Sequence, residues 1–162
     1  MPESVYIETT IPSYLSAFPS VRTLESFRQR ETQEWWIFRR PSYELYTSEV
    51  VWDECLKGDP LMVAERRNLL DGITELKVTP EAEMLAKAFV DSGVVPLKAR
   101  TDAMHIAISA VQYIDLLLTW NCTHIANPHI QTRLRQVAQK HGYNLPTLCT
   151  PEALNHASDN LP

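Results

Sequence analysis

One helix-like segment and the strand-like run after it constrain the fold of this chain more than any other stretch. In residues 98–110, small and apolar side chains recur at helical spacing on one face, which lets such a helix lie close to a sheet. Residues 116–118 are apolar and give way abruptly to polar residues, as in a buried strand of a parallel sheet. Asp102 begins the helix and Asn121 follows the strand. Because ligands collect at the carboxyl ends of strands in open α/β sheets, a site is expected there.

The rest of the chain alternates between predicted strands and predicted helices. Strands are predicted at residues 5–7, 43–47, 73–78 and 147–150, and helices at 11–15, 20–40, 48–57, 60–70, 80–92, 127–142 and 151–155. This order predicts a three-layer α/β/α sandwich with a mainly parallel central sheet. The length fits a single domain over residues 1–155, followed by a loose C-terminal tail at 156–162.

Charge and cysteine content limit the partners and the compartment. The formal net charge of −5 argues against a general electrostatic grip on nucleic acid, although a local basic rim remains compatible with it. Lys98 and Arg100 precede Asp102, and two interpretations stay open for them: contacts to RNA phosphates or a solvated helix face. The 3 cysteines are widely spaced with no CxxC pair, which favours reduced thiols in a cytoplasmic protein. Neither a signal peptide nor a membrane span is expected.

Four polar side chains from distant parts of the chain are expected at one sheet edge: Glu8 after the first strand, Glu54, Asp102 and Asn121. Glu54 lies on the inward side of its predicted helix, whereas Asp53 can remain in water. Three converging carboxylates repel one another and therefore need a divalent cation. Since no His or Cys pair accompanies these oxygen ligands, Mg²⁺ or Mn²⁺ is favoured. Thr9, Thr10 and Thr119 are predicted to hydrogen-bond the ligating carboxylates.

Each of the four also has an ordinary structural interpretation. Asp102 suits the first turn of a helix because of the helix dipole, and Asn121 suits a turn. Glu8 is equally a strand-terminal acid, and Glu54 can reach solvent from near a helix end. His105 and His124 are interpreted as structural rather than as metal-binding or proton-transfer groups. The functional hypothesis therefore depends on all four side chains lying together at one edge of the sheet.

The ordered set of short motifs resembles the PIN domain and, within it, the VapC-like toxins of bacterial toxin–antitoxin pairs. The resemblance covers residues 4–150 and is carried by residues 6–10, by Ser48 with Glu54 six positions later, and by residues 102–107 and 118–121. It implies a metal-dependent endoribonuclease with Glu8, Glu54 and Asp102 as acidic ligands and Asn121 at the place of a fourth acid. It also implies a homodimer inhibited by an antitoxin protein.

Two positions depart from the family pattern, which usually has Asp where Glu8 stands and often Asp where Asn121 stands. The first change lengthens the side chain by one methylene and the second removes a negative charge, so weaker metal binding is expected. A non-catalytic PIN-like module that binds RNA or a protein is the alternative hypothesis. A phosphoryl-transfer or receiver-type domain is disfavoured, because no adjacent acids follow the first strand and the 4 glycines form no phosphate-binding loop.

Overall fold

Five parallel strands form the centre of the molecule in the computed structural model, which describes residues 1–157. The strands are β1 (Ser4–Ile7), β2 (Glu44–Ser48), β3 (Thr74–Leu76), β4 (Leu116–Leu118) and β5 (Thr147–Cys149). They lie in the order β3-β2-β1-β4-β5, and every neighbouring pair is parallel. The sheet thus places β1 beside β4, which is more than a hundred residues away in the chain. The predicted parallel α/β architecture is confirmed.

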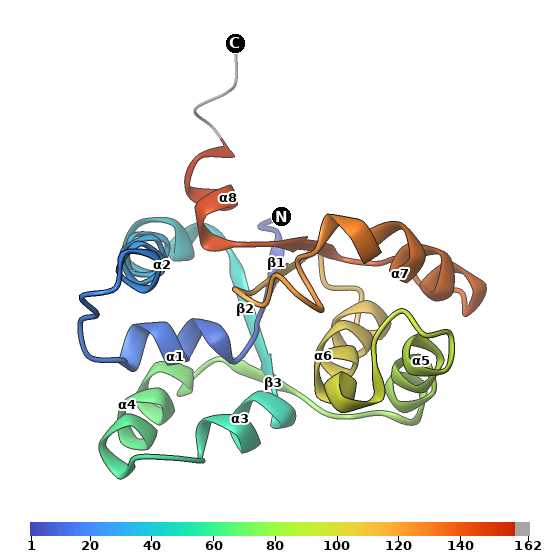
Figure 1. The fold of residues 1–162 in the computed structure, drawn as a ribbon, viewed down its shortest axis with the longest axis horizontal. Helices are drawn as coiled ribbons and strands as arrows, with labels where there is room; N and C mark the ends of the chain where they lie inside the picture. The colour runs from blue at the N-terminus through green and yellow to red at the C-terminus, as the bar shows by residue number, and fades with distance from the viewer. Residues whose placement is uncertain (158–162) are drawn as a thin grey trace.

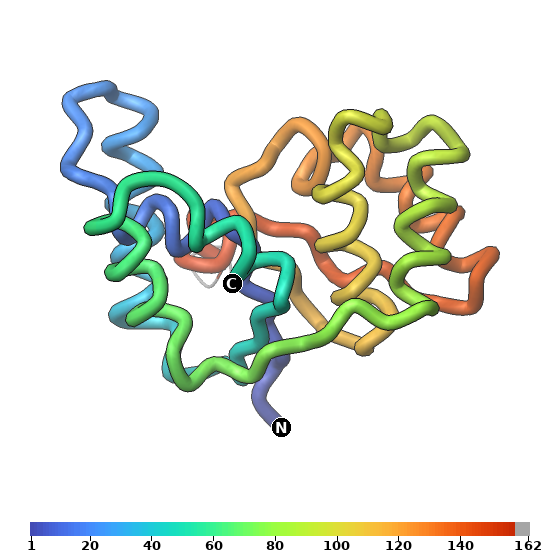
Figure 2. Tube along the Cα trace, turned by 90° about the horizontal axis from the view of Figure 1, so that it is seen from below, coloured from blue at the N-terminus to red at the C-terminus, as the bar shows by residue number. Residues whose placement is uncertain are grey.

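The helices surround this sheet on both sides. They are α1 (Thr10–Ser16), α2 (Thr23–Glu34), α3 (Glu49–Cys55), α4 (Pro60–Leu70), α5 (Pro80–Asp91), α6 (Arg100–Val111), α7 (Pro128–Lys140) and α8 (Pro151–Asn155). In Figure 1, α1 and α2 lie on one side of the strands and α5 to α7 on the other, a division that is also visible from below in Figure 2. Helix α3 packs with the second group through Val51 and Cys55. Side chains of Ser48, Asp59 and Thr79 accept hydrogen bonds from backbone N–H groups at the starts of α3, α4 and α5.

The segment predicted as one helix over residues 20–40 differs from that expectation. A regular helix covers only Thr23–Glu34; a wider π-type turn, η1 (Trp35–Arg39), and a 3-10 turn, η2 (Arg40–Ser42), follow it. The N–H of Arg40 bonds to the carbonyl of Trp35, five residues back. The wider turn places Trp35 in the core, and Pro41, which has no N–H, prevents a return to a regular helix.

The period-two alternation of β1 divides the core between the two faces of the sheet. Val5 and Ile7 pack with Ile11 and Trp35 in one buried cluster. Tyr6 points to the opposite face and packs in a second cluster with apolar side chains of α3, α5, α6 and α7. The Tyr6 hydroxyl therefore lies beneath α6, at the helix that carries Asp102.

The parallel arrangement brings the carboxyl ends of β1, β2 and β4 to one edge of the sheet. The hydrogen-bond ladder continues past the strands, because the N–H of Glu8 bonds to the carbonyl of Leu118 at 3.1 Å and the N–H of Thr119 to that of Cys149 at 3.0 Å. Glu8, Ser48 and Thr119 are held at this edge.

Two further expectations concern the ends and the helices of the chain. Residues 158–162 of the predicted tail lie outside the described residues. Within residues 1–157, no helix is both long enough and apolar enough to pass through a bilayer.

Candidate functional site

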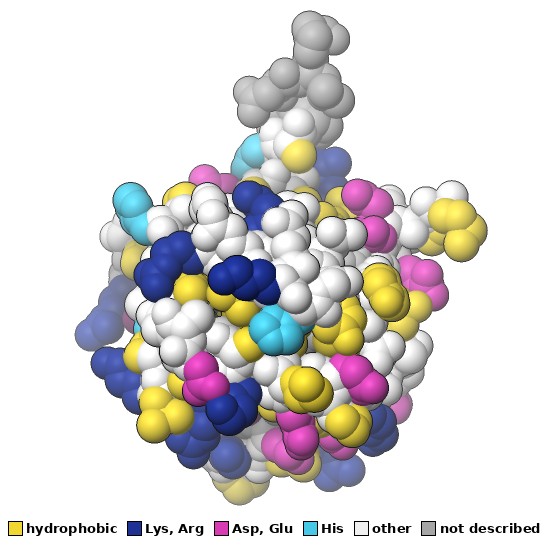
Figure 3. All heavy atoms as spheres, turned by 90° about the vertical axis from the view of Figure 1, so that its right-hand side faces the viewer, with side chains coloured by type: hydrophobic (Ala, Val, Ile, Leu, Met, Phe, Trp, Pro, Cys, Tyr) yellow, Lys and Arg dark blue, Asp and Glu magenta, His cyan; other side chains and the backbone are white. Residues whose placement is uncertain are grey.

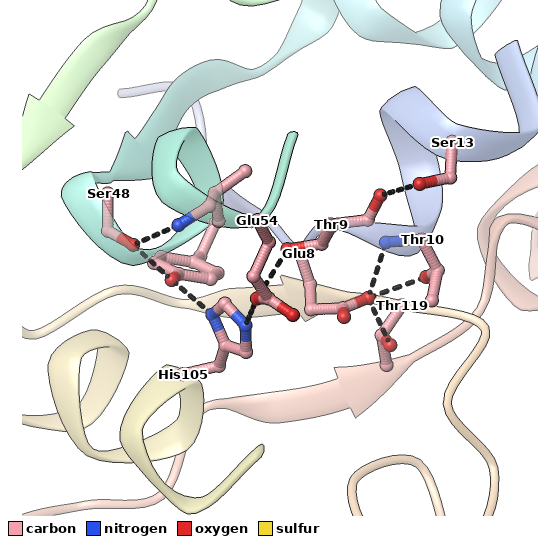
Figure 4. A network of polar contacts seen from close by, with 10 residues as sticks. Glu8, Thr9, Thr10, Ser13, Ser48, Glu54, His105 and Thr119 are labelled. Carbon is pink, nitrogen blue, oxygen red and sulfur yellow. Dashed lines mark hydrogen bonds and ion pairs between the residues drawn. The ribbon is translucent and has the colours of Figure 1, made fainter. Parts of the chain in front are cut away.

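Glu8 is a buried carboxylate fixed through one oxygen. Only 3% of the residue is exposed. Its Oε2 accepts hydrogen bonds from the N–H and hydroxyl of Thr10 and from the hydroxyl of Thr119, the last at 2.8 Å (Figure 4). The Thr10 hydroxyl in turn accepts the N–H of Trp120 at 2.8 Å. Three donors on one oxygen hold the carboxylate in a single orientation and compensate its burial.

Glu54 reaches the same edge from α3 and is also held through one oxygen. Its Oε1 accepts the Thr9 hydroxyl at 2.8 Å and lies 2.6 Å from Nε2 of His105 (Figure 4). Burial raises the pKa of Glu54, but the hydrogen bond and charge of His105, together with the Thr9 hydroxyl, outweigh it and bring the pKa below its usual value. Asp53, the neighbouring acid, is exposed as predicted.

His105 is the residue that sequence analysis undervalued. It is completely buried in α6, and its Nδ1 lies 2.7 Å from the Tyr6 hydroxyl. Burial lowers the pKa of His105, yet the hydrogen bond to Glu54 and the charges of Glu8, Glu54 and Asp102 raise it above the usual value. The sequence did offer one signal for this residue: His105 lies three positions after Asp102, and residues three apart lie on the same face of a helix.

A second histidine, His124, links Asp102 to the turn that contains Asn121. Oδ2 of Asp102 is 3.0 Å from Nδ1 of His124. The Asn121 side-chain oxygen accepts the N–H groups of Thr123 at 3.3 Å and His124 at 3.0 Å, so it closes the turn that presents His124 to Asp102. Both acceptor sites of this amide oxygen are therefore used within the turn. Its role as a direct metal ligand stays a prediction.

The donor chemistry of the three carboxylates fits a hard divalent cation. In the part of the chain that the structure describes, Glu8 Oε1, Glu54 Oε2 and Asp102 Oδ1 have no hydrogen-bond partner, whereas the second oxygen of each is fixed. All three charges act on His105. Across residues 1–157, however, no three His, Cys, Asp or Glu side chains are arranged to hold a metal ion. His105 and His124 each hydrogen-bond one oxygen of one of these carboxylates, Glu54 and Asp102 respectively.

The basic residues considered for RNA contact lie at the surface. Lys98 and Arg100 are both exposed, on either side of the buried Ala99 at the start of α6. Figure 3 shows the face formed on the side of α5, α6 and α7, where basic, acidic and hydrophobic side chains are mixed. This face is not uniformly basic, which agrees with the negative net charge.

The parallel strand order, the helices on both faces and the acidic edge define a PIN-type α/β fold. VapC20 of Mycobacterium tuberculosis, a sarcin-ricin loop cleaving toxin, superposes with a TM-score of 0.51 and 19% identity over 70% of this chain and 86% of that chain. VapBC2 of Rickettsia felis, solved bound to a DNA fragment from its promoter, superposes with a TM-score of 0.55 and 8% identity over 91% and 98%. The predicted likeness to VapC toxins is thus confirmed at the level of the fold. No model of a known family and no curated protein matches the sequence.

Proposed function

We propose that this protein is a metal-dependent endoribonuclease that hydrolyses RNA phosphodiester bonds. The observation that carries the proposal is the edge of the sheet, where Glu8, Glu54 and Asp102 each have one oxygen fixed by the protein and one without a hydrogen-bond partner among the described residues. Their charges all act on one buried histidine, although they come from three distant segments. The fold shared with VapC20, a sarcin-ricin loop cleaving toxin, supports this interpretation.

The three carboxylates would hold one or two Mg²⁺ or Mn²⁺ ions. When bound, such a cation lowers the pKa of a coordinated water and neutralises charge on the phosphate. The residues around it do the rest. Thr9, Thr10 and Thr119 fix the carboxylates through hydrogen bonds, and a carboxylate oxygen not used for binding the cation can accept the proton of the water. Lys98 and Arg100 are proposed to contact RNA phosphates near Asp102.

We also propose that the protein is the toxin of a toxin–antitoxin pair, that it forms a homodimer and that a small antitoxin protein binds it. The superposition on VapBC2 over most of both chains supports the pairing. We expect a coexpressed antitoxin to copurify with this protein and to inhibit its RNA cleavage.

One observation favours an alternative, a PIN-like module that binds RNA or protein without cleaving. Asn121 takes the place of an acid and its oxygen is used within a turn, so the site has one charge less than four acids would give. Tight RNA binding with no cleavage in Mg²⁺ or Mn²⁺ would favour this alternative.

The first prediction tests catalysis directly. Asp102→Asn removes a charge with almost no change in shape, so it should abolish cleavage while leaving the melting temperature close to that of the wild type. Cleavage is measured on a labelled sarcin-ricin loop hairpin and on total RNA in Mn²⁺. Asp53→Asn, which changes an exposed acid beside Glu54, is the control and should cleave normally. Wild-type cleavage rates in Asp102→Asn would remove Asp102 from the mechanism.

A further inference from the structure

A chain of four hydrogen-bonded side chains runs through the core to Glu54. The Ser48 Oγ lies 2.7 Å from the Tyr6 hydroxyl, which lies 2.7 Å from Nδ1 of His105, and Nε2 of His105 lies 2.6 Å from Glu54 (Figure 4). Ser48, Tyr6 and His105 are each 0% exposed. They come from the end of β2, from β1 and from α6, so three separate elements converge on one ring.

Counting donors and acceptors gives this chain a direction. A carboxylate only accepts, so Nε2–H of His105 donates to Glu54. In the neutral ring Nδ1 is then an acceptor, and the Tyr6 hydroxyl donates to it. The Tyr6 oxygen accepts from Ser48, whose own oxygen accepts the N–H of Val51 at 3.3 Å. Each group is satisfied, and the opposite neutral tautomer would set two lone pairs against each other at Glu54.

From this arrangement we infer that His105 is a positioning residue for Glu54, an inference that rests on the proposed function. Together with Thr9 it holds Oε1 and so leaves Oε2 as the oxygen available to a divalent cation. Tyr6 and Ser48 keep the imidazole in the tautomer and orientation that this requires. Partners that orient metal ligands in this way typically change metal affinity by about 10- to 100-fold when they are removed.

Two substitutions of His105 separate positioning from packing. In His105→Gln, the amide nitrogen can occupy the place of Nε2 and still donate to Glu54. In His105→Asn, the shorter side chain matches Nδ1 and cannot reach Glu54. Both lose packing of the buried ring, so both should melt at lower temperature. Only His105→Asn should bind Mn²⁺ about 10- to 100-fold more weakly in calorimetric titration. His129→Gln, at an exposed histidine, is the control.

Equal Mn²⁺ affinity in His105→Asn and the wild type would overturn the inference. An equal loss of Mn²⁺ affinity in His105→Gln and His105→Asn would also overturn it, because a purely structural role of His105 predicts equal losses. Absence of Mn²⁺ binding and of RNA cleavage in the wild type would instead overturn the proposed function, and with it the inference that Glu54 is positioned for a cation.

A measurement without metal tests the geometry separately. Long-range ¹H–¹⁵N spectra identify which ring nitrogen of His105 carries the proton. Chelator-treated wild type at a pH where the ring is neutral should show Nε2–H only. Glu54→Gln, whose amide can either donate to Nε2 or accept from it, should mix the tautomers, whereas Tyr46→Phe, whose hydroxyl contacts Glu44, should not. Nδ1–H in the wild type would contradict the hydrogen-bond direction and overturn the inference even if Mn²⁺ binds.

Discussion

At the residue scale, this site stands out for the way its negative charge is balanced. Glu8 relies on three donors from threonines and backbone, Glu54 on Thr9 and a buried histidine, and Asp102 on His124. A buried carboxylate without such partners would cost several kcal/mol. One oxygen of each acid is therefore held in a fixed position, and the other has no hydrogen-bond partner among residues 1–157.

The coupling of His105 and Glu54 predicts how stability depends on pH in the metal-free protein. The pKa of His105 is raised from 6.5, so its contribution is complete below about pH 6.5 and is lost as pH rises through the folded-state value. The pKa of Glu54 is lowered from 4.5, so its contribution is present above about pH 4.5 and is lost as pH falls through the folded-state value.

Urea denaturation of wild type and His105→Gln in chelator tests this dependence. The difference in unfolding free energy should be largest near about pH 5.5 and smaller near about pH 9, because the charged pair exists only in the window between the two shifted pKa values. A difference that is the same at both pH values would show that the pair carries no net charge coupling.

Asn121→Asp tests the place of the missing fourth acid. The carboxylate can accept the same two N–H groups, so the turn to His124 should persist while one negative charge is added. Mn²⁺ affinity should rise about tenfold, which corresponds to about 1.4 kcal/mol. Asn68→Asp, on the exposed side of α4, adds the same charge elsewhere and should leave affinity unchanged. No gain in Asn121→Asp would place residue 121 outside the site.

At the scale of elements, α6 matters because it is packed on nearly every side. Ala103, Ile106, Ala107 and Ala110 are at most 1% exposed, so small side chains let this helix lie between the sheet and α5. The same close packing fixes His105 against Tyr6. The position of the site thus depends on the small size of these apolar side chains, which take no part in the proposed reaction.

Ala107→Leu is predicted to destabilise the protein by about 1–3 kcal/mol, because no space exists for the added atoms. Thermal or urea unfolding measures this effect. Thr101→Leu makes a similar change at an exposed position of the same helix and should stay within about 0.5 kcal/mol of the wild type. Equal stability of the two variants would mean that the contact between α6 and its neighbours is looser than described.

The elements that sequence analysis predicted well are those with local signals. Ser48, Asp59 and Thr79 begin their helices at the predicted places, because a capping side chain acts within three residues. The π-type turn at Trp35 was missed, because no local signal marks it and it accompanies the burial of one ring in the tertiary fold. The predicted strand ends also placed Glu8 and Thr119 at the observed edge, because the carboxyl ends of parallel strands lie at one edge of a sheet.

The histidine chain had no local signal of comparable strength. Its contacts join residues separated by 42, 99 and 51 positions, and such approaches follow only from the completed fold. A fully buried histidine always needs partners, but the sequence does not say which ones.

At the scale of the whole molecule, the site is assembled from elements that lie far apart in the chain. Glu8 follows β1 in the sheet, Glu54 lies in α3, and Asp102 and His105 lie in α6, which shares a buried cluster with α3. An ion shared by these acids would join the end of β1 to both helices. Metal binding should therefore depend on all three elements together.

Calorimetric titration with Mn²⁺ tests this claim most directly, on the wild type and on Glu8→Gln, Glu54→Gln, Asp102→Asn and Asp53→Asn. The account predicts binding in the wild type and in Asp53→Asn. In each of the other three, affinity should fall by more than the about 10- to 100-fold that is typical of losing a residue that only supports a ligand, since each removes a ligand of a common ion. Binding that survives unchanged in all three, or a wild type that binds no Mn²⁺, would contradict a shared cation site.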